Sequence, residues 1–248
     1  MKLLLSAAVF VSLSFFLSCK RIADFEAPCK IMMLTEKYQH QPIYPIEYDT
    51  LRIYYNSKGN PVRLDYTSNE TGKPDYFFTY DNKDRLIELV SKYGSFIEFT
   101  HKYYYNNNQF IEYDTTFYAD QSIRVSYVIH KYTYDDKGRI IRIDDKTNFG
   151  AEFSHKYGYN TTGNRILQQG YPVDGSTYDN KINLLRTNLI FCFLNRDYSV
   201  NNLRAATSYN TKDLPLAFPF YPTTDPNVLP RIHFLNMMVH EVTYSCEH

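Results

Sequence analysis

Three histidines that recur with the same neighbours are the residues of this chain whose type and spacing come nearest to a chemical site. His101, His130 and His155 each open a copy of the pattern His-Lys-Tyr-x-Tyr. Imidazole nitrogen is a zinc ligand, so the pattern raises the hypothesis of a metal site. If the copies lie on every second strand of a sheet, however, neighbouring histidines stand about 9–10 Å apart and three cannot share one ion. We therefore expect no metal and no cofactor, and we expect the histidines to bond neighbouring tyrosine hydroxyls.

The tyrosines of the same copies are the second candidate. On an open face they would form a platform on which sugar rings stack, whereas on a covered face they would pack across strands and hold the sheet together. The sequence favours packing, and any uncovered part of this face is the candidate binding surface. Its residues are Tyr103, Tyr105, Tyr132, Tyr134, Tyr157 and Tyr159.

Neither the acidic residues nor a search for known catalytic motifs identifies a catalytic residue in the sequence. His240-Glu241 lies near Glu247-His248, but this spacing matches no metalloprotease helix, and the local alternation is typical of a strand. The sequence has no Gly-x-Ser-x-Gly, phosphate loop or Cys-x-x-Cys. Most acidic residues fall at turn corners or on the outer face, so we expect a protein that is not an enzyme.

The elements that must position these residues are repeated β-hairpins. The best copy, residues 130–143, reads His-Lys-Tyr-Thr-Tyr-Asp-Asp-Lys-Gly-Arg-Ile-Ile-Arg-Ile. A fixed period of about 25 residues indicates stacked supersecondary units. The tyrosines that precede the turns are Tyr55, Tyr80, Tyr105, Tyr134 and Tyr159, with a sixth at Tyr209.

The turn chemistry supports this interpretation. Asp or Asn follows each of these tyrosines and suits the first corner of a type I turn. The last turn position should have positive φ, and it falls on residue types that tolerate this conformation. We place it at Gly59, Asp84, Asn108, Gly138 and Gly163, the third turn being one residue shorter.

The flanking residues alternate as in strands with one buried face. Before the turns the tyrosines share a face, opposite Lys102, Lys131 and Lys156. After the turns Val62/Leu64, Ile87/Leu89 and Ile141/Ile143 form the expected inward pairs. We predict an all-β fold, either a curved antiparallel sheet or a partly closed barrel built from these hairpins, with a loop-rich C-terminal segment that covers it. Residues 182–194 suit either a short helix or a buried strand.

The motif Tyr-x-Tyr-Asp-x-x-Gly-Arg-Ile at residues 132–140 resembles the YD (RHS-type) repeat. Over roughly residues 50–245 the chain looks like a group of uncharacterised lipoproteins of Bacteroides-type bacteria. The resemblance implies a β-rich fold outside the cytoplasm. The large RHS proteins build closed shells from many such repeats, and six hairpins are too few to carry that function over.

The N-terminus resembles the signal peptide of a bacterial lipoprotein. Lys2 precedes an apolar run over residues 3–17, and Phe16-Leu17-Ser18-Cys19 resembles the lipobox, with Phe16 where Leu is usual. The resemblance implies cleavage before Cys19 and acylation of its thiol; the alternative is an ordinary secretory signal. We expect a signal peptide over 1–18, an anchor and tether with one early strand over 19–48, and a single domain over 49–248. Within it the repeats span about 49–170 and the covering segment 171–248.

Three cysteines remain if Cys19 is acylated, so at most one disulfide forms. Cys192 lies in an apolar run and is expected to be a buried hydrophobic residue. A bond between Cys29 and Cys246 would tie the two ends of the domain together, although sequence alone does not show their proximity.

The net charge and the expected cellular location limit the possible classes of function. Lys plus Arg and Asp plus Glu both total 27, so zero net charge gives no basis for binding nucleic acid. We expect a protein of the cell envelope, lipid-anchored to the outer membrane on its periplasmic or surface face. The leading hypothesis is a non-enzymatic binding module for a glycan or an envelope protein. The alternatives are a structural component of an envelope assembly and, third, a glycan-active enzyme.

Overall fold

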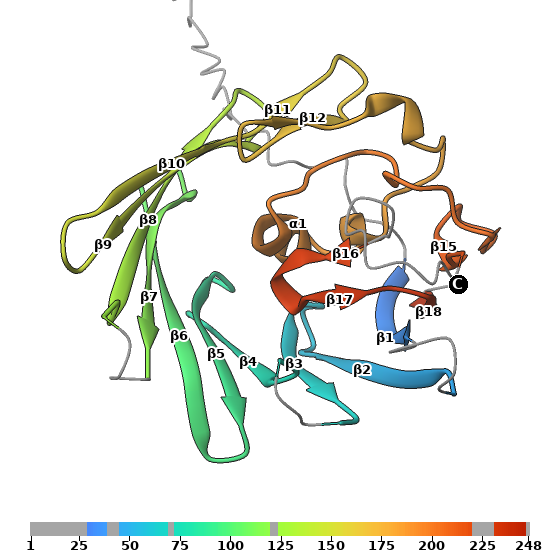
Figure 1. Cartoon of the computed structure of the whole chain (residues 1–248), viewed down its shortest axis with the longest axis horizontal. Helices are drawn as coiled ribbons and strands as arrows, with labels where there is room; N and C mark the ends of the chain where they lie inside the picture. The colour runs from blue at the N-terminus through green and yellow to red at the C-terminus, as the bar shows by residue number, and fades with distance from the viewer. Residues whose placement is uncertain (1–28, 39–44, 69–71, 120–123, 220–230, 247–248) are drawn as a thin grey trace, which may run out of the picture.

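An antiparallel sheet of 13 strands dominates the fold and curves around the C-terminal part of the chain (Figure 1). The structure is a computed structural model and describes residues 29–38, 45–68, 72–119, 124–219 and 231–246. The predicted signal peptide and Cys19 lie outside these residues. Within the described part of the chain, no helix is long and apolar enough to cross a membrane.

The first ten strands follow one another across the sheet in chain order, as repeated hairpins require. They are β1 (Cys29–Tyr38), β2 (Glu47–Tyr55), β3 (Pro61–Tyr66), β4 (Asp75–Tyr80), β5 (Leu86–Tyr93), β6 (Phe96–Tyr105), β7 (Ile111–Tyr118), β8 (Tyr127–Tyr134), β9 (Ile140–Thr147) and β10 (Glu152–Lys156). Beyond β1 the sheet continues through β18 (Glu241–Cys246), β15 (Pro215–Ala217) and β14 (Ser208–Tyr209). Because β10 and β14 form its two edges, the sheet is open, and the curved-sheet alternative is the one observed.

Each hairpin turn is held by the Asn or Asp that follows the tyrosine. In the best copy the Asp135 carboxylate accepts the N–H groups of Lys137 at 3.0 Å and Arg139 at 2.9 Å. The last turn position has positive φ throughout, as predicted, but in the third turn this residue is Gln109 (φ 67°) and not Asn108. The third turn therefore has full length. The sixth turn, closed by Asp213 (φ 61°), joins β14 to β15.

Because of a β-bulge beside each turn, the inward-facing residues after the turn differ from the predicted pairs. Tyr80 pairs with Leu86 while Thr79 pairs with Glu88, so one extra residue lies on the second strand. Leu86 and Leu89 consequently point inward, and Ile87 is exposed. The same shift in β9 buries Ile140 completely and leaves Ile141 half-buried. The first member of each predicted pair was assigned to the wrong face.

In the first four hairpins the tyrosine before the turn also bonds one hairpin to the next. Its hydroxyl reaches back to a backbone carbonyl in the preceding hairpin, and that carbonyl belongs to the first residue of β3, β5 or β7 in three of the cases. The bonds run from Tyr55 to Ile31 (2.7 Å), Tyr80 to Pro61 (2.6 Å), Tyr105 to Leu86 (2.9 Å) and Tyr134 to Ile111 (2.8 Å). The repeat thus supplies its own inter-hairpin contact.

The covering segment, residues 171–248, both covers the sheet and extends it. Inside the curve lie η2 (Leu184–Thr187), α1 (Leu189–Asn195), η3 (His233–Leu235) and the pair β16 (Arg231–Ile232) and β17 (Met237–Met238) (Figure 1). The remaining short elements are η1 (Gly175–Thr177) and a small sheet of β11 (Gly158–Tyr159), β12 (Arg165–Gln168) and β13 (Tyr171–Pro172). Phe191 and Phe193 of α1 join the sheet residues in one hydrophobic core, so the helical alternative for this apolar run is observed. Strands β14, β15 and β18 extend the sheet beyond β1.

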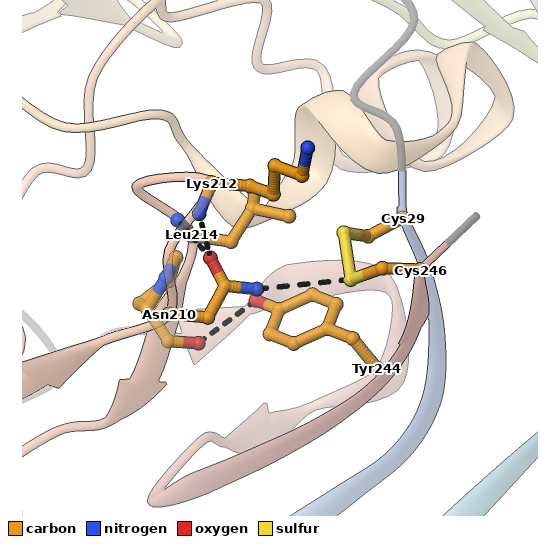
Figure 2. Close-up of a disulfide and its surroundings, with 7 residues drawn as sticks. Cys29, Asn210, Lys212, Leu214, Tyr244 and Cys246 are labelled. Carbon is orange, nitrogen blue, oxygen red and sulfur yellow. Dashed lines mark hydrogen bonds between the residues drawn. A yellow bond between two sulfur atoms is a disulfide. The ribbon is translucent and has the colours of Figure 1, made fainter. Parts of the chain in front are cut away.

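A disulfide joins the two ends of the domain. Cys29 and Cys246 are paired residues of β1 and β18 and are linked across 217 positions (Figure 2). Asn210 of the sixth turn lies beside this bond, with Nδ2 at 3.9 Å from the Cys246 sulfur. Because β1 lies between β2 and β18, the early strand expected within 19–48 is part of the main sheet. Cys192 is a buried free thiol.

Candidate functional site

A cleft of about 420 Å³ lies between the concave face of the sheet and the covering segment. Its aromatic lining consists of Tyr76, Phe99, Tyr103, Tyr157 and Phe234. Its polar lining includes the histidines His101, His130, His155 and His233, together with Asp145 and Arg196. Gln168, Gln169 and Asn195 add amide groups. This volume falls within the range of about 300–1,000 Å³ that is usual for small-molecule sites.

The repeat brings three of the histidines to this cleft from alternate strands. His101 lies on β6, His130 on β8 and His155 on β10, all on the concave face. The intervening strands place polar side chains between them: Thr116 pairs with His101 across β6 and β7, and Asp145 pairs with His130 across β8 and β9. The sheet register thus alternates imidazoles with groups that can bond them.

These side chains form one continuous chain across five strands, made of hydrogen bonds and, at its end, an ion-pair contact. His101 Nδ1 lies 2.8 Å from Asp114 Oδ2 and 2.7 Å from Thr116 Oγ1. Thr116 Oγ1 lies 3.1 Å from His130 Nε2, and His130 Nδ1 lies 2.6 Å from Asp145 Oδ1. The chain ends at His155, whose Nε2 lies 3.1 Å from Asp145 Oδ2.

The partners in this chain fix where the protons lie. An ionised carboxylate only accepts, so His101 Nδ1, His130 Nδ1 and His155 Nε2 each donate an N–H. The Thr116 hydroxyl then donates to the lone pair of His130 Nε2, so these contacts require no second proton on any of the three rings. His101 Nε2 and His155 Nδ1 make no bond with any described residue and are available to a ligand.

Asp114 supports this chain from beneath the cleft. Its carboxylate is fully buried and also accepts the hydroxyl of Tyr132. Burial acts to raise the pKa of Asp114, but the hydrogen bond from His101 and the nearby cationic groups outweigh it and hold that pKa below its ordinary value. Asp114 is therefore an ionised anchor for the first histidine.

Arg196 closes the other side of the network. It follows α1 in the left-handed conformation (φ 53°), and its Nη1 donates to the carbonyls of Phe193 at 3.1 Å and Leu194 at 2.7 Å. Nη2 donates to the Tyr132 hydroxyl at 3.1 Å, which in turn donates to Asp114. The Nε–H and the second Nη2–H bond to no acceptor within the described chain. Arg196 thus lines the cleft with unused donors.

The predicted tyrosine face is mostly packed. Tyr103, Tyr132 and Tyr157 are buried against the covering segment, where the Phe193 ring lies 5.8 Å from Tyr103 and 5.2 Å from Tyr132. Of these three, Tyr103 and Tyr157 also line the cleft. The remaining members, Tyr105, Tyr134 and Tyr159, are half-buried and pack against the core.

The structure corrects the expectation for the histidines. Their partners are carboxylates and a threonine, not tyrosine hydroxyls, and the ring centres of His101 and His130 lie 6.3 Å apart, closer than two strand spacings. Sequence reasoning missed Asp114, Thr116, Asp145 and Arg196. The available signal was the polar run Asp-Thr-Thr at 114–116, which breaks the apolar inner face opposite the histidines.

The other sequence candidates form no comparable site. His240 Nε2 lies 3.8 Å from the exposed Glu241 carboxylate at the start of β18, while Glu247 and His248 lie outside the described residues. Within the described ranges, no group of three or more His, Cys, Asp or Glu residues is arranged to hold a metal ion.

No family model matches the chain, and no curated protein matches it. Similar solved structures include the crystal structure of TcdB2-TccC3-Cdc42, with a TM-score of 0.31 and 12% identity over 49% of this chain and 7% of that one. Another is a porin-like protein from Bacteroides uniformis, with a TM-score of 0.37 and 10% identity over 60% of this chain and 62% of that one. The chain therefore spans less than two thirds of either structure.

Proposed function

We propose that this protein is a lipid-anchored envelope protein that binds a glycan in the cleft, without catalysing a reaction on it. The observation that carries the proposal is the convergence of aromatic rings and hydrogen-bonding side chains in one cleft of about 420 Å³. A sugar ring presents apolar C–H groups on its faces and hydroxyls at its rim. A site that combines ring faces with amide, imidazole and guanidinium groups matches both.

The two kinds of side chain come from different elements. Tyr76 and Phe99 lie on neighbouring parts of the sheet with ring centres 6.4 Å apart, and Phe234 of η3 lies 6.2 Å from Tyr76. The amides of Gln168 and Asn195 come from β12 and the end of α1. A sugar in the cleft would contact rings near β4 and β6 and amides of β12 and of the covering segment.

The envelope location is supported by the lipobox-like stretch ending at Cys19 and by the disulfide between Cys29 and Cys246. Disulfides persist in oxidising compartments such as the periplasm and the cell surface. If Cys19→Ser leaves palmitate labelling and membrane association unchanged, the anchor proposal fails.

Binding is tested with the mature chain, with Cys19 replaced by Ser, on a panel of neutral and acidic oligosaccharides by calorimetry. We expect a ligand whose affinity falls about two- to tenfold in Phe99→Ala, since one aromatic contact contributes about 0.5–1.5 kcal/mol. Tyr104→Ala, on the exposed outer face, is the matched control and should bind as the wild type does. The proposal fails if no oligosaccharide of the panel binds, or if the cleft variants bind with the same affinity as the wild type.

A structural role in an envelope assembly is the second candidate, and the outer face of the sheet favours it. Tyr104 and Tyr113 are both exposed there, with stacked rings 4.6 Å apart, and Phe117 and Tyr127 continue the aromatic strip. Cross-linking in intact cells followed by comparison with Tyr104→Ser/Phe117→Ser tests this role. Loss of a specific cross-linked product in the variant would support it.

A further inference from the structure

The ionisable groups of the cleft point to the class of glycan that it takes; this inference rests on the proposed binding function. The cationic or protonatable lining groups are His101 from β6, His130 from β8, His155 from β10, His233 from η3 and Arg196 after α1. Among the described lining residues the one carboxylate is Asp145, which His130 and His155 already share. The buried Asp114 is likewise occupied, by His101 and Tyr132.

Among the described lining residues, the remaining titratable groups are phenols. Burial raises the pKa of Tyr76, Tyr103 and Tyr157, and it also raises that of Tyr118, which interacts with Asp145, so these side chains carry no charge at neutral pH. The charge that the cleft presents to a ligand is therefore set by Arg196 and by the protonation of the histidines.

Two of these histidines, His101 and His155, each have a ring nitrogen that is able to accept a second proton, which makes the ring cationic. As neutral rings, His101 and His155 each leave one nitrogen, Nε2 and Nδ1 respectively, with only a lone pair and no partner among the described residues. A proton added at either nitrogen creates a new N–H that needs an acceptor. The unused N–H groups of Arg196 need an acceptor as well.

We propose that the cleft binds an acidic sugar, with a carboxylate accepting from Arg196 and the cationic histidines, and that binding is coupled to proton uptake by the histidines. A ligand carboxylate favours the protonated form of each histidine that it contacts, so binding takes up protons and weakens as pH rises. For one proton taken up, the affinity falls by up to about tenfold per pH unit.

The experiment compares trimers of galacturonate and of glucuronate with the same trimers after reduction of their carboxyl groups. Calorimetry at about pH 6 and about pH 8, on either side of the usual histidine range, measures affinity. Two buffers of different ionisation enthalpy measure the protons taken up. We expect at least one acidic trimer to bind about tenfold or more tightly than its reduced form at the lower pH, with net proton uptake and weaker binding at the higher pH.

Variants locate the effect. His155 is the most exposed of the three repeat histidines, at 35% of its side chain, so His155→Asn should leave the fold intact while reducing proton uptake and the pH dependence. Arg196→Gln should remove the preference for the acidic trimer, and Arg196→Lys should retain part of it. His240→Asn, which alters a histidine outside the cleft lining, is the control and should behave as the wild type does.

Each other outcome overturns the proposal in a distinct way. Equal binding of acidic and reduced trimers without proton uptake would refute acidic-sugar recognition and leave glycan binding standing. If neutral oligosaccharides of the panel bind and neither acidic trimer does, acidic-sugar recognition is likewise refuted and glycan binding is left standing. Failure of every acidic and neutral oligosaccharide would refute both this inference and the proposed function.

Discussion

Removing the bond between Cys29 and Cys246 should cost this protein a large part of its stability. The disulfide spans 217 positions and therefore restricts almost the whole described chain when it is unfolded. In the chain-entropy treatment, a loop of that length corresponds to about 5 kcal/mol at 25 °C. Natural domains are stable by only about 5–15 kcal/mol. The double variant Cys29→Ala/Cys246→Ala should consequently be close to unfolding at physiological temperature.

Urea denaturation followed by far-UV circular dichroism measures this difference, because the sheet supplies the signal. The double variant is preferable to a reducing agent, since it leaves the wild-type protein oxidised under the same conditions. Cys192→Ala, which changes the buried free thiol and leaves the disulfide intact, is the control for loss of a cysteine. A loss below about 1 kcal/mol would refute the entropy argument. Mass spectrometry that finds Cys29 and Cys246 both free after export would refute the pairing itself.

The remaining predictions concern single side chains. Asp114→Asn should lower the free energy of unfolding by about 3–5 kcal/mol, since it breaks a buried charged network, whereas Asp144→Asn on the outer face should cost less than about 1 kcal/mol; urea denaturation measures both. Because the folded pKa of Asp114 is lowered, its contribution is present above the unfolded value of about 3.9 and is lost as pH falls through the folded value. The stabilities of Asp114→Asn and the wild type should therefore converge in acid. Gly163→Ala should destabilise by about 1–3 kcal/mol more than Gly150→Ala, because both residues have positive φ but only at Gly163 would a Cβ meet Val200, at 2.8 Å; thermal denaturation decides, and equal losses would contradict the clash. Tyr134→Phe should cost about 1 kcal/mol through its bond to the Ile111 carbonyl, and Tyr113→Phe on the outer face should cost nothing measurable.

The hairpins could be predicted because their determinants are local. Asp135 holds its turn through bonds to residues two and four positions on, so the spacing of Asp, Asn and Gly in the sequence carries the information. The positive φ of Gln109 was not predicted, because glutamine seldom adopts this conformation. The exposure of Ile87 was not predicted, because a bulge adds one residue and reverses the alternation from which the buried face is assigned.

The site could be predicted only in part, because it depends on pairing between strands. The repeat identifies His101 and His130, but Asp114 and Asp145 have no place in its motif and meet the histidines only through the register of β7 and β9. The side of the cleft that the covering segment forms is still harder to predict from the sequence. Arg196 follows an apolar run that suited a helix or a strand equally well, and only as a helix does α1 bring it beside Tyr132.

The position of β1 between β2 and β18 has a consequence for the order in which the chain can fold. Strands β2 to β10 pair with near neighbours, so they are able to form before the C-terminal part of the chain has folded. One side of β1 must wait for β18, the last strand to arrive. Until then it is an unpaired strand edge, the feature through which β proteins join wrong partners. This edge is therefore covered only when β18 pairs with β1, and the disulfide then holds the two strands together.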